Sequence, residues 1–216
     1  MAHHRHGRPP RPSLAPATRW EQEMTGEEWE GYVARFDLLA DAGEDLDGEA
    51  RLIDALAPRG ARVLDAGAGT GRVAAALTRM GHLALGVDRD TGLVERARAR
   101  YLGVPYLASD LLDLDPEVLA DEGFADPFDV VALPGNVLVF VAPGTERDVL
   151  STMHGLLRPG GRLVAGFATD RAYGVDDLDR DLAAVGLQHE HRYSTWQLDP
   201  WHDDASWQVT VARRPA

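Results

Sequence analysis

The chain has 216 residues, no cysteine and a formal net charge of −13, and arginine supplies all 22 of its basic side chains. These values exclude disulfide frameworks, cysteine-based zinc sites and cysteine nucleophiles, and they disfavour proteins that track a nucleic-acid backbone. The length suits one domain with a small appendage. The sequence has no apolar run of membrane-spanning length and no signal peptide, so we expect a cytoplasmic protein that binds neither nucleic acid nor a membrane.

Residues 1–18 form a segment of their own, rich in proline, histidine and arginine. This composition is typical of a disordered tail. His3, His4 and His6 could bind a metal adventitiously, but nothing around them would order the ligands. The sequence therefore predicts no metal site in this tail.

The next segment, residues 19–60, is acidic and is predicted to form an N-terminal lid of two helices. Residues 25–28 match a capping box, and apolar side chains then recur at helical spacing over 29–39. A second helix is predicted over 48–56. The pair can fold over a sheet, with the phenol of Tyr32 reaching a polar ligand group. The alternative is that these helices only cover apolar surface.

The stretch 63–71 reads Val-Leu-Asp-Ala-Gly-Ala-Gly-Thr-Gly, so an apolar run ends in an acid and glycines follow at alternate positions. Helical periodicity begins directly afterwards and predicts a helix over 71–79, which gives the order strand, glycine turn, helix. Gly67 and Gly69 let the backbone come close to a ligand. The dinucleotide-binding fingerprint would need a glycine in place of Arg72, which argues against that class. The alternative is an ordinary strand-to-helix turn.

This pattern resembles motif I of the class I S-adenosylmethionine-dependent methyltransferases. The resemblance implies that S-adenosyl-L-methionine is the cofactor and that the glycine turn lies against it through its backbone. The contacts implied here are Asp65, Gly67, Ala68 and Gly69. In this family a tyrosine of a leading helix often approaches the methionine end of the cofactor, which implies the same role for Tyr32.

A strand is predicted over 83–87 and ends in Asp88, 21 residues after Gly67. A carboxylate in this place accepts the ribose hydroxyls of a bound nucleoside. Arg89 is expected beside the same ligand, whereas Asp90 is placed to cap the next helix. The alternative is that Asp88 serves only the turn.

A short strand predicted over 104–107 leads into Ser109, Asp110 and Leu111. The resemblance implies that Asp110 accepts a hydrogen bond from the adenine amino group. It also implies that the N–H of Ser109 or Leu111 donates to a ring nitrogen. The alternative is that Asp110 is a plain loop acid.

A continuous apolar run over 128–133 predicts a central strand that ends at Leu133. Pro134, Gly135 and Asn136 follow on the other side of the crevice in which open α/β sheets bind ligands. We expect Leu133 and Asn136 to contact the cofactor, and Asn136 is also a weak catalytic candidate. Its alternative role is an Asx-turn. Methyltransferases that act on exocyclic amines carry Asp/Asn-Pro-Pro-Tyr/Phe here, so the sequence excludes that subclass.

The remaining elements are predicted as a helix over 145–157, a strand over 162–167, a helix over 175–185 and strands over 188–196 and 207–213. Because no helix separates the last two strands, they indicate an antiparallel hairpin. Residues 61–216 are therefore expected to form the methyltransferase domain. Its fold is a doubly wound α/β sheet of seven strands in the order 3-2-1-4-5-7-6, with strand 7 antiparallel.

The link between the last two strands carries His202, the best candidate for a general base. The alternative is an exposed loop histidine. His189 and His191 lie on one strand face, as metal ligands can, but without a third ligand they are interpreted as solvent-facing.

The sequence thus predicts in-line transfer of a methyl group from S-adenosylmethionine to a small-molecule acceptor, with no metal. A non-catalytic cofactor-binding or protein-interaction module on the same fold stays open as the alternative. A nicotinamide-dependent oxidoreductase is disfavoured by Arg72 and by the terminal hairpin.

Overall fold

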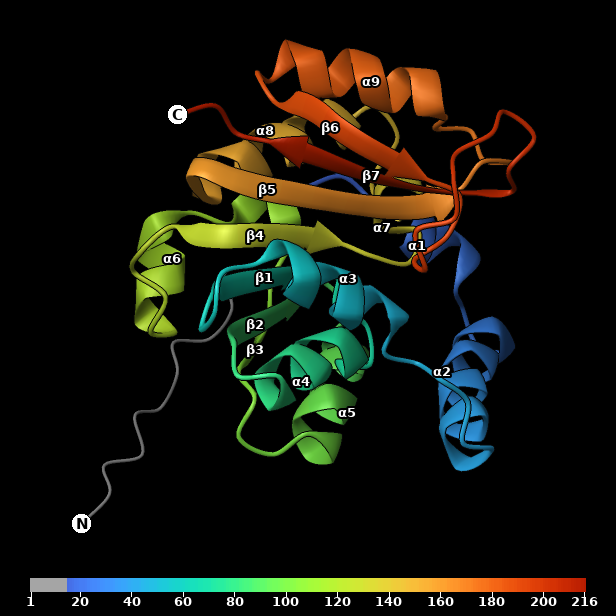
Figure 1. Cartoon of the computed structure of the whole chain (residues 1–216). Helices are drawn as coiled ribbons and strands as arrows, with labels where there is room; N and C mark the ends of the chain where they lie inside the picture. Colours follow the sequence, from blue (N-terminus) through green and yellow to red (C-terminus); the bar gives the residue numbers. More distant parts are fainter. Residues whose placement is uncertain (1–14) are drawn as a thin grey trace.

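The computed structural model describes residues 15–216 as a seven-stranded sheet with helices on both faces (Figure 1). The strand order is β3-β2-β1-β4-β5-β7-β6, and neighbours are parallel except for the two antiparallel pairs that β7 forms. The strands are β1 (Arg62–Ala66), β2 (Leu83–Asp88), β3 (Tyr106–Ala108), β4 (Phe128–Leu133), β5 (Leu157–Ala168), β6 (Gln188–Tyr193) and β7 (Trp207–Arg213). This architecture confirms the predicted fold.

The central strands are apolar on both faces because helices cover both. In β1, Val63 and Leu64 point to opposite layers, and both are fully buried. The layer on the Val63 side contains α3 (Gly48–Leu56), α4 (Arg72–Arg79) and α5 (Thr91–Arg100). The layer on the Leu64 side contains η1 (Leu111–Asp113), α6 (Pro116–Asp121), α7 (Val137–Phe140), α8 (Glu146–Leu156) and α9 (Val175–Ala184).

Two short helices, α1 (Arg19–Glu23) and α7, were not predicted from the sequence. The first is started by a capping box in which the Thr18 hydroxyl accepts the Glu21 N–H and the Glu21 carboxylate accepts the Thr18 N–H. At 25–28, where the sequence predicted a capping box, the hydrogen bond is made by the backbone. There the Glu28 N–H donates to the backbone carbonyl of Thr25.

Several strand boundaries differ from the predicted ones for identifiable reasons. β5 begins at Leu157, because that residue already pairs with Phe128 of β4. β6 ends at Tyr193, because the chain then turns and the Ser194 N–H donates to the Asp199 carbonyl. β3 begins two residues later than predicted and ends one residue later, because its pairing with β2 begins at Tyr106. None of these shifts changes the strand order.

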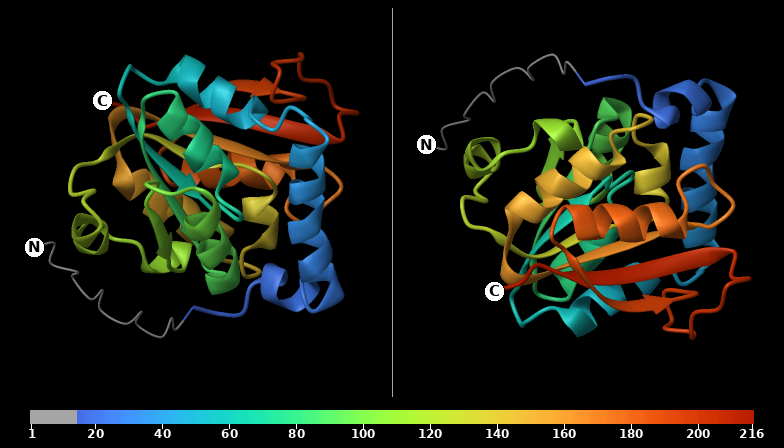
Figure 2. Two further views of the ribbon diagram at one scale, coloured as in Figure 1. Left: turned by 90° about the horizontal axis from the view of Figure 1, so that it is seen from below. Right: turned by 90° about the horizontal axis from the view of Figure 1, so that it is seen from above.

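The N-terminal helices α1 and α2 (Glu27–Asp41) lie beyond the carboxyl ends of the parallel strands, as Figure 1 and Figure 2 show. The predicted apolar stripe of α2 faces the body of the protein, and Val33 within it is only 3% exposed. The residues that precede α1 also contact the body, since the Pro16 carbonyl accepts a hydrogen bond of 2.9 Å from Arg89. The predicted tail therefore reaches the folded domain at its end. His3, His4 and His6 lie outside the described residues.

The link between β6 and β7 closes the same end of the sheet. The Trp196 ring lies over Gly166 of β5, where an added Cβ would come within 2.4 Å of the indole. The Gln197 side chain lies against Gly48 at the start of α3. No helix within residues 15–216 is both long and apolar enough to cross a membrane.

Candidate functional site

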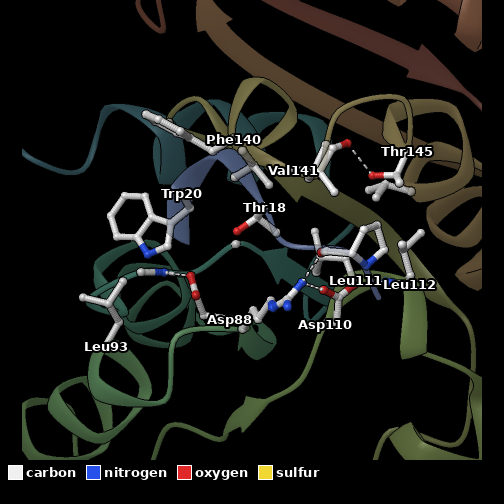
Figure 3. A pocket seen from close by; sticks show the side chains of 18 of the residues that line it. Thr18, Trp20, Asp88, Leu93, Asp110, Leu111, Leu112, Phe140, Val141 and Thr145 are labelled. Carbon is white, nitrogen blue, oxygen red and sulfur yellow. Dashed lines mark hydrogen bonds and ion pairs between the residues drawn. The ribbon is translucent and has the colours of Figure 1, made fainter. Parts of the chain in front are cut away.

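A cavity opens at the carboxyl ends of β1, β2 and β4, with about 750 Å³ of empty space including its mouth (Figure 3). The sheet side of the wall consists of Gly67, Gly69, Asp88, Arg89, Leu93, Asp110, Leu111, Leu112, Gly135 and Val137. The rest of the wall is Pro16, Thr18, Trp20, Tyr32, Phe140, Val141, Ala142, Thr145 and Val149. Seven of the predicted cofactor contacts are among them: Tyr32, Gly67, Gly69, Asp88, Arg89, Asp110 and Leu111.

The glycine turn after β1 requires glycine at both cavity-lining positions. Gly67 and Gly69 have positive φ values of 80° and 55°, a region that other residues rarely adopt. A Cβ on Gly67 would lie 2.4 Å from a methyl carbon of Val137, and a Cβ on Gly69 would lie 3.0 Å from the Tyr32 hydroxyl. The turn is therefore packed against α7 on one side and α2 on the other.

Asp88 ends β2 and holds the turn in place. One carboxylate oxygen accepts the Gly69 N–H at 2.8 Å, and the other accepts the Asp90 N–H at 2.9 Å. A carboxylate offers about four acceptor positions, so it can still accept ligand hydroxyls. Removal from water raises the pKa of Asp88 to about 6. As the sequence indicated, the cap of α5 is Asp90, whose carboxylate accepts the Gly92 and Leu93 N–H groups.

Asp110, which follows β3, forms an ion pair with Arg89 in the cavity wall. Asp110 is 8% exposed, and its two oxygens accept the Leu112 N–H and the Arg89 guanidinium, both at 2.8 Å. Arg89 also pairs with Glu21 of α1 at 3.0 Å. The pair thus connects the predicted adenine-binding acid to the N-terminal helices.

Tyr32 projects from α2 toward the glycine turn. Its ring packs edge-to-face against Trp20 and Phe36, with centroids 4.9 and 5.1 Å away. Burial, and next the charge of Asp88, raise the pKa of the Tyr32 phenol to about 12. The phenol is therefore protonated at neutral pH and available as a hydrogen-bond donor.

Five predicted contacts lie outside the cavity wall: Asp65, Ala68, Ser109, Leu133 and Asn136. Asp65 is 1% exposed, and only one of its oxygens has a partner, the Ala74 N–H at 2.9 Å. Burial raises the pKa of Asp65 to about 7. Leu133 is a core residue. The Asn136 side chain accepts the Ala168 N–H at 2.8 Å, so it joins the ends of β4 and β5.

The histidines named from the sequence are not gathered into a site. His202 is exposed in the β6–β7 link and is absent from the cavity wall. His189 and His191 are also exposed, and the pairing of β6 shifts register between them. Among residues 15–216, no group of three metal-ligating side chains is found.

Pro16, Thr18 and Trp20 are wall residues that the sequence did not identify. Their segment was included in the predicted tail or at the edge of the lid. The signal that could have found them is the spacing of Thr18 and Glu21, which is that of a capping box just before a helix.

Comparison with known proteins places this geometry in a family. Residues 63–161 match the model of a methyltransferase domain. The chain is similar to the crystal structure of a TehB-like S-adenosylmethionine-dependent methyltransferase from Corynebacterium glutamicum, with 35% identity and a TM-score of 0.78. That alignment covers 86% of this chain and 97% of the other.

Two curated relatives are more distant. One is a demethylmenaquinone methyltransferase from Clavibacter sepedonicus, 32% identical over 134 residues, which are 60% of this chain and 51% of the relative. The other is a tRNA 5-carboxymethoxyuridine methyltransferase from Escherichia coli, 28% identical over 179 residues, or 77% and 66% of the two chains. The chain thus spans about half the length of the first relative.

Proposed function

Because the chain belongs to the class I S-adenosylmethionine-dependent methyltransferases, we propose that it transfers a methyl group from S-adenosylmethionine to a small-molecule nucleophile. The observation that carries this proposal is the cavity itself. It joins the glycine turn and the acids of β2 and η1 to a wall built by the N-terminal residues.

The residues of the cavity fit this cofactor. A Cβ on Gly67 would overlap Val137 and one on Gly69 would crowd the Tyr32 hydroxyl, so the glycine turn presents backbone to a ligand. Asp88 retains acceptor positions for ribose hydroxyls. Asp110, after the neighbouring strand β3, can accept from an amino group in competition with Arg89. Tyr32 offers a hydroxyl donor beside Gly69.

The bound sulfonium would supply an electrophilic methyl group, and the protein would supply orientation and exclusion of water. The described cavity wall contains no histidine, and its tyrosine has a raised pKa. Neither residue type therefore provides a strong base at neutral pH. We infer that the acceptor atom reacts without a histidine or tyrosine base, and we assign catalysis to neither His202 nor Asn136.

A small acceptor agrees better with this cavity than a nucleic acid does. Pro16, Thr18, Trp20 and Tyr32 add a wall on the N-terminal side, so the cavity is bounded by more than the end of the sheet. The net charge of −13 also opposes binding to a phosphate backbone. The relative from Escherichia coli acts on tRNA according to its name, so transfer to tRNA is the activity to test as a competitor.

We further propose that residues 19–60 act as the N-terminal lid. α1 and α2 stand over the cavity and carry Trp20 and Tyr32 into its wall. If they close over the cofactor, amide hydrogens of residues 20–45 exchange quickly in the free protein and slowly with S-adenosylhomocysteine bound. Identical exchange in both states would leave these helices as packing only.

Calorimetric titration with S-adenosylmethionine, S-adenosylhomocysteine and NAD tests the proposal most directly. Binding of the first two, without NAD, is the expected result. Binding of NAD alone would refute the proposal. No binding of any of the three would favour the protein-interaction module.

A further inference from the structure

One carboxylate connects both N-terminal helices to the wall of the cavity. Asp90 Oδ2 accepts the indole N–H of Trp20 from α1 at 3.1 Å and that of Trp29 from α2 at 2.7 Å. Its other oxygen, Oδ1, accepts the Gly92 and Leu93 N–H groups at the start of α5. Each oxygen thus serves a different purpose: one caps a helix of the domain, and the other holds the lid.

The two tryptophans are placed to transmit this contact to the cavity. Trp20 is itself a wall residue, as Figure 3 shows, and its ring packs against Tyr32 and Phe140 at 4.9 and 5.6 Å. The Trp29 ring packs against α5, so closely that a Cβ on Gly92 would come within 3.1 Å of it. Loss of the hydrogen bonds to Asp90 would therefore loosen both Trp20 in the cavity wall and Trp29 in the first turn of α2.

Asp90 is also joined to the predicted ribose-binding carboxylate. Its backbone N–H donates to Asp88, whose other oxygen accepts the Gly69 N–H. The lid, the strand-end acid and the glycine turn are thus linked by consecutive hydrogen bonds.

We propose that Asp90 is a positioning residue that fastens α1 and α2 over the cavity and so slows release of the cofactor. The proposal rests on the proposed function, because the cofactor is the ligand that the lid retains. Asp90 is not among the residues of the cavity wall, and its effect is exerted through Trp20 and Trp29. A capping role alone would leave the lid independent of it.

The variant Asp90→Asn separates the two roles. An asparagine keeps one oxygen, which is a good N-cap acceptor, but it replaces the other with an amide nitrogen that only donates. The indole N–H groups of Trp20 and Trp29 would then point at the amide N–H₂ group and would have no acceptor there. Trp29→Phe removes one donor, keeps an apolar ring and leaves the cap untouched. Asp115→Asn is the matched control, because Asp115 caps α6 through the Val118 N–H and lies outside the cavity wall.

The experiment measures the dissociation rate of S-adenosylhomocysteine by a chase with unlabelled ligand, together with amide exchange of the free proteins. In Asp90→Asn we expect dissociation to be about tenfold faster or more, as loss of charge-assisted hydrogen bonds implies. Exchange should accelerate over residues 19–41 but not over α5. Trp29→Phe should act in the same direction, and combining it with Asp90→Asn should add little, because both remove the same contact. Asp115→Asn should match the wild type.

Unchanged dissociation in both Asp90→Asn and Trp29→Phe, with the wild type binding normally, would overturn the proposal. So would faster exchange confined to the first turn of α5. If Asp90→Asn fails to fold, Trp29→Phe decides alone, since it preserves the cap. Failure of the wild type to bind S-adenosylhomocysteine would refute the proposed function instead, and the exchange of residues 19–41 in the free variants would still decide whether Asp90 fastens the lid.

Discussion

Replacing Asp88 is the sharpest test of how this cavity holds a nucleoside. Asp88→Ala removes the acceptor of the Gly69 and Asp90 N–H groups. Asp88 is partly exposed, so water can replace the carboxylate, and each lost bond should cost about 1 kcal/mol of unfolding free energy. For a chain of this size that total corresponds to a fall of about 4–8 °C in Tm. The variant should therefore stay folded at room temperature.

The expected effect on the cofactor is larger. Two charge-assisted bonds to ribose hydroxyls are worth about 1.5–3 kcal/mol each when well formed. After partial replacement by water, the affinity for S-adenosylhomocysteine should still fall by about tenfold or more. Asp88→Asn retains an acceptor and should lose less. Asp113→Ala, which removes an exposed acid of η1 outside the cavity wall, is the control for a general change in charge.

The raised pKa of Asp88 adds a second observable. Its value of about 6 means that the carboxyl gains a proton as the pH falls through 6, and a neutral carboxyl accepts hydrogen bonds more weakly. Calorimetry at several values between pH 5 and about pH 8 should therefore show affinity falling toward acid in the wild type but not in Asp88→Asn. A loss of less than about threefold in Asp88→Ala, or the same pH dependence in Asp88→Asn, would mean that the carboxylate supports only the turn.

Three further predictions concern the same end of the molecule. Burial raises the pKa of Asp65 from 3.8 to about 7, so the folded state favours the neutral carboxyl. The free energy of unfolding should therefore be highest below pH 3.8 and should fall as the pH rises to 7, by on the order of 4 kcal/mol. Urea unfolding should show this loss in the wild type and not in Asp65→Asn; parallel pH profiles would contradict it. Gly67→Ala should destabilise by about 2–4 kcal/mol, through its positive φ and its overlap with Val137. Adding Val137→Ala should recover part of the Tm, because the closest remaining contact would be the Val137 Cβ at 3.2 Å, and no recovery would mean that the turn packs differently. Removing residues 1–14 should leave the affinity for S-adenosylhomocysteine unchanged, whereas removing residues 1–23 should lower it. The longer deletion takes Pro16, Thr18 and Trp20 from the cavity wall. Equal affinities of the two truncated proteins would mean that these three residues do not contribute to binding.

The sheet was predictable because its signals are local. The strand over 128–133 is apolar except for Asp129, which suits burial between two helical layers, and the structure has β4 at those residues. The run from 207 to 213 was also predicted with the observed limits. Residue spacing identified the glycine turn, and the stretch from Gly67 to Asp88 holds one turn, one helix and one strand, so both of its ends could be placed.

The predictions were weaker where a residue's role depends on distant partners. Asn136 has the sequence context of a crevice residue, but its amide joins β4 to β5 through Ala168, 32 positions away. Asp65 belongs to the motif, yet its carboxylate caps the start of α4 through the Ala74 N–H. Neither partner is visible in local spacing. Trp20 was missed because its neighbours in the cavity, Tyr32 and Phe140, lie far from it in the sequence.

Arg72 shows how one substitution in a motif changes the surroundings of the site. In dinucleotide-binding folds the corresponding glycine allows close packing of helix and strand. Here the guanidinium leaves the start of α4 and pairs with Glu49 of α3, donates to the Leu46 carbonyl at 2.7 Å, and lies 5.3 Å from the ring centroid of Phe36 on α2. The arginine that argues against a dinucleotide site thus joins α2 and α3 to α4. A glycine there would leave Glu49 without its ion pair, so the motif helix and the helices that precede the sheet depend on each other in this chain.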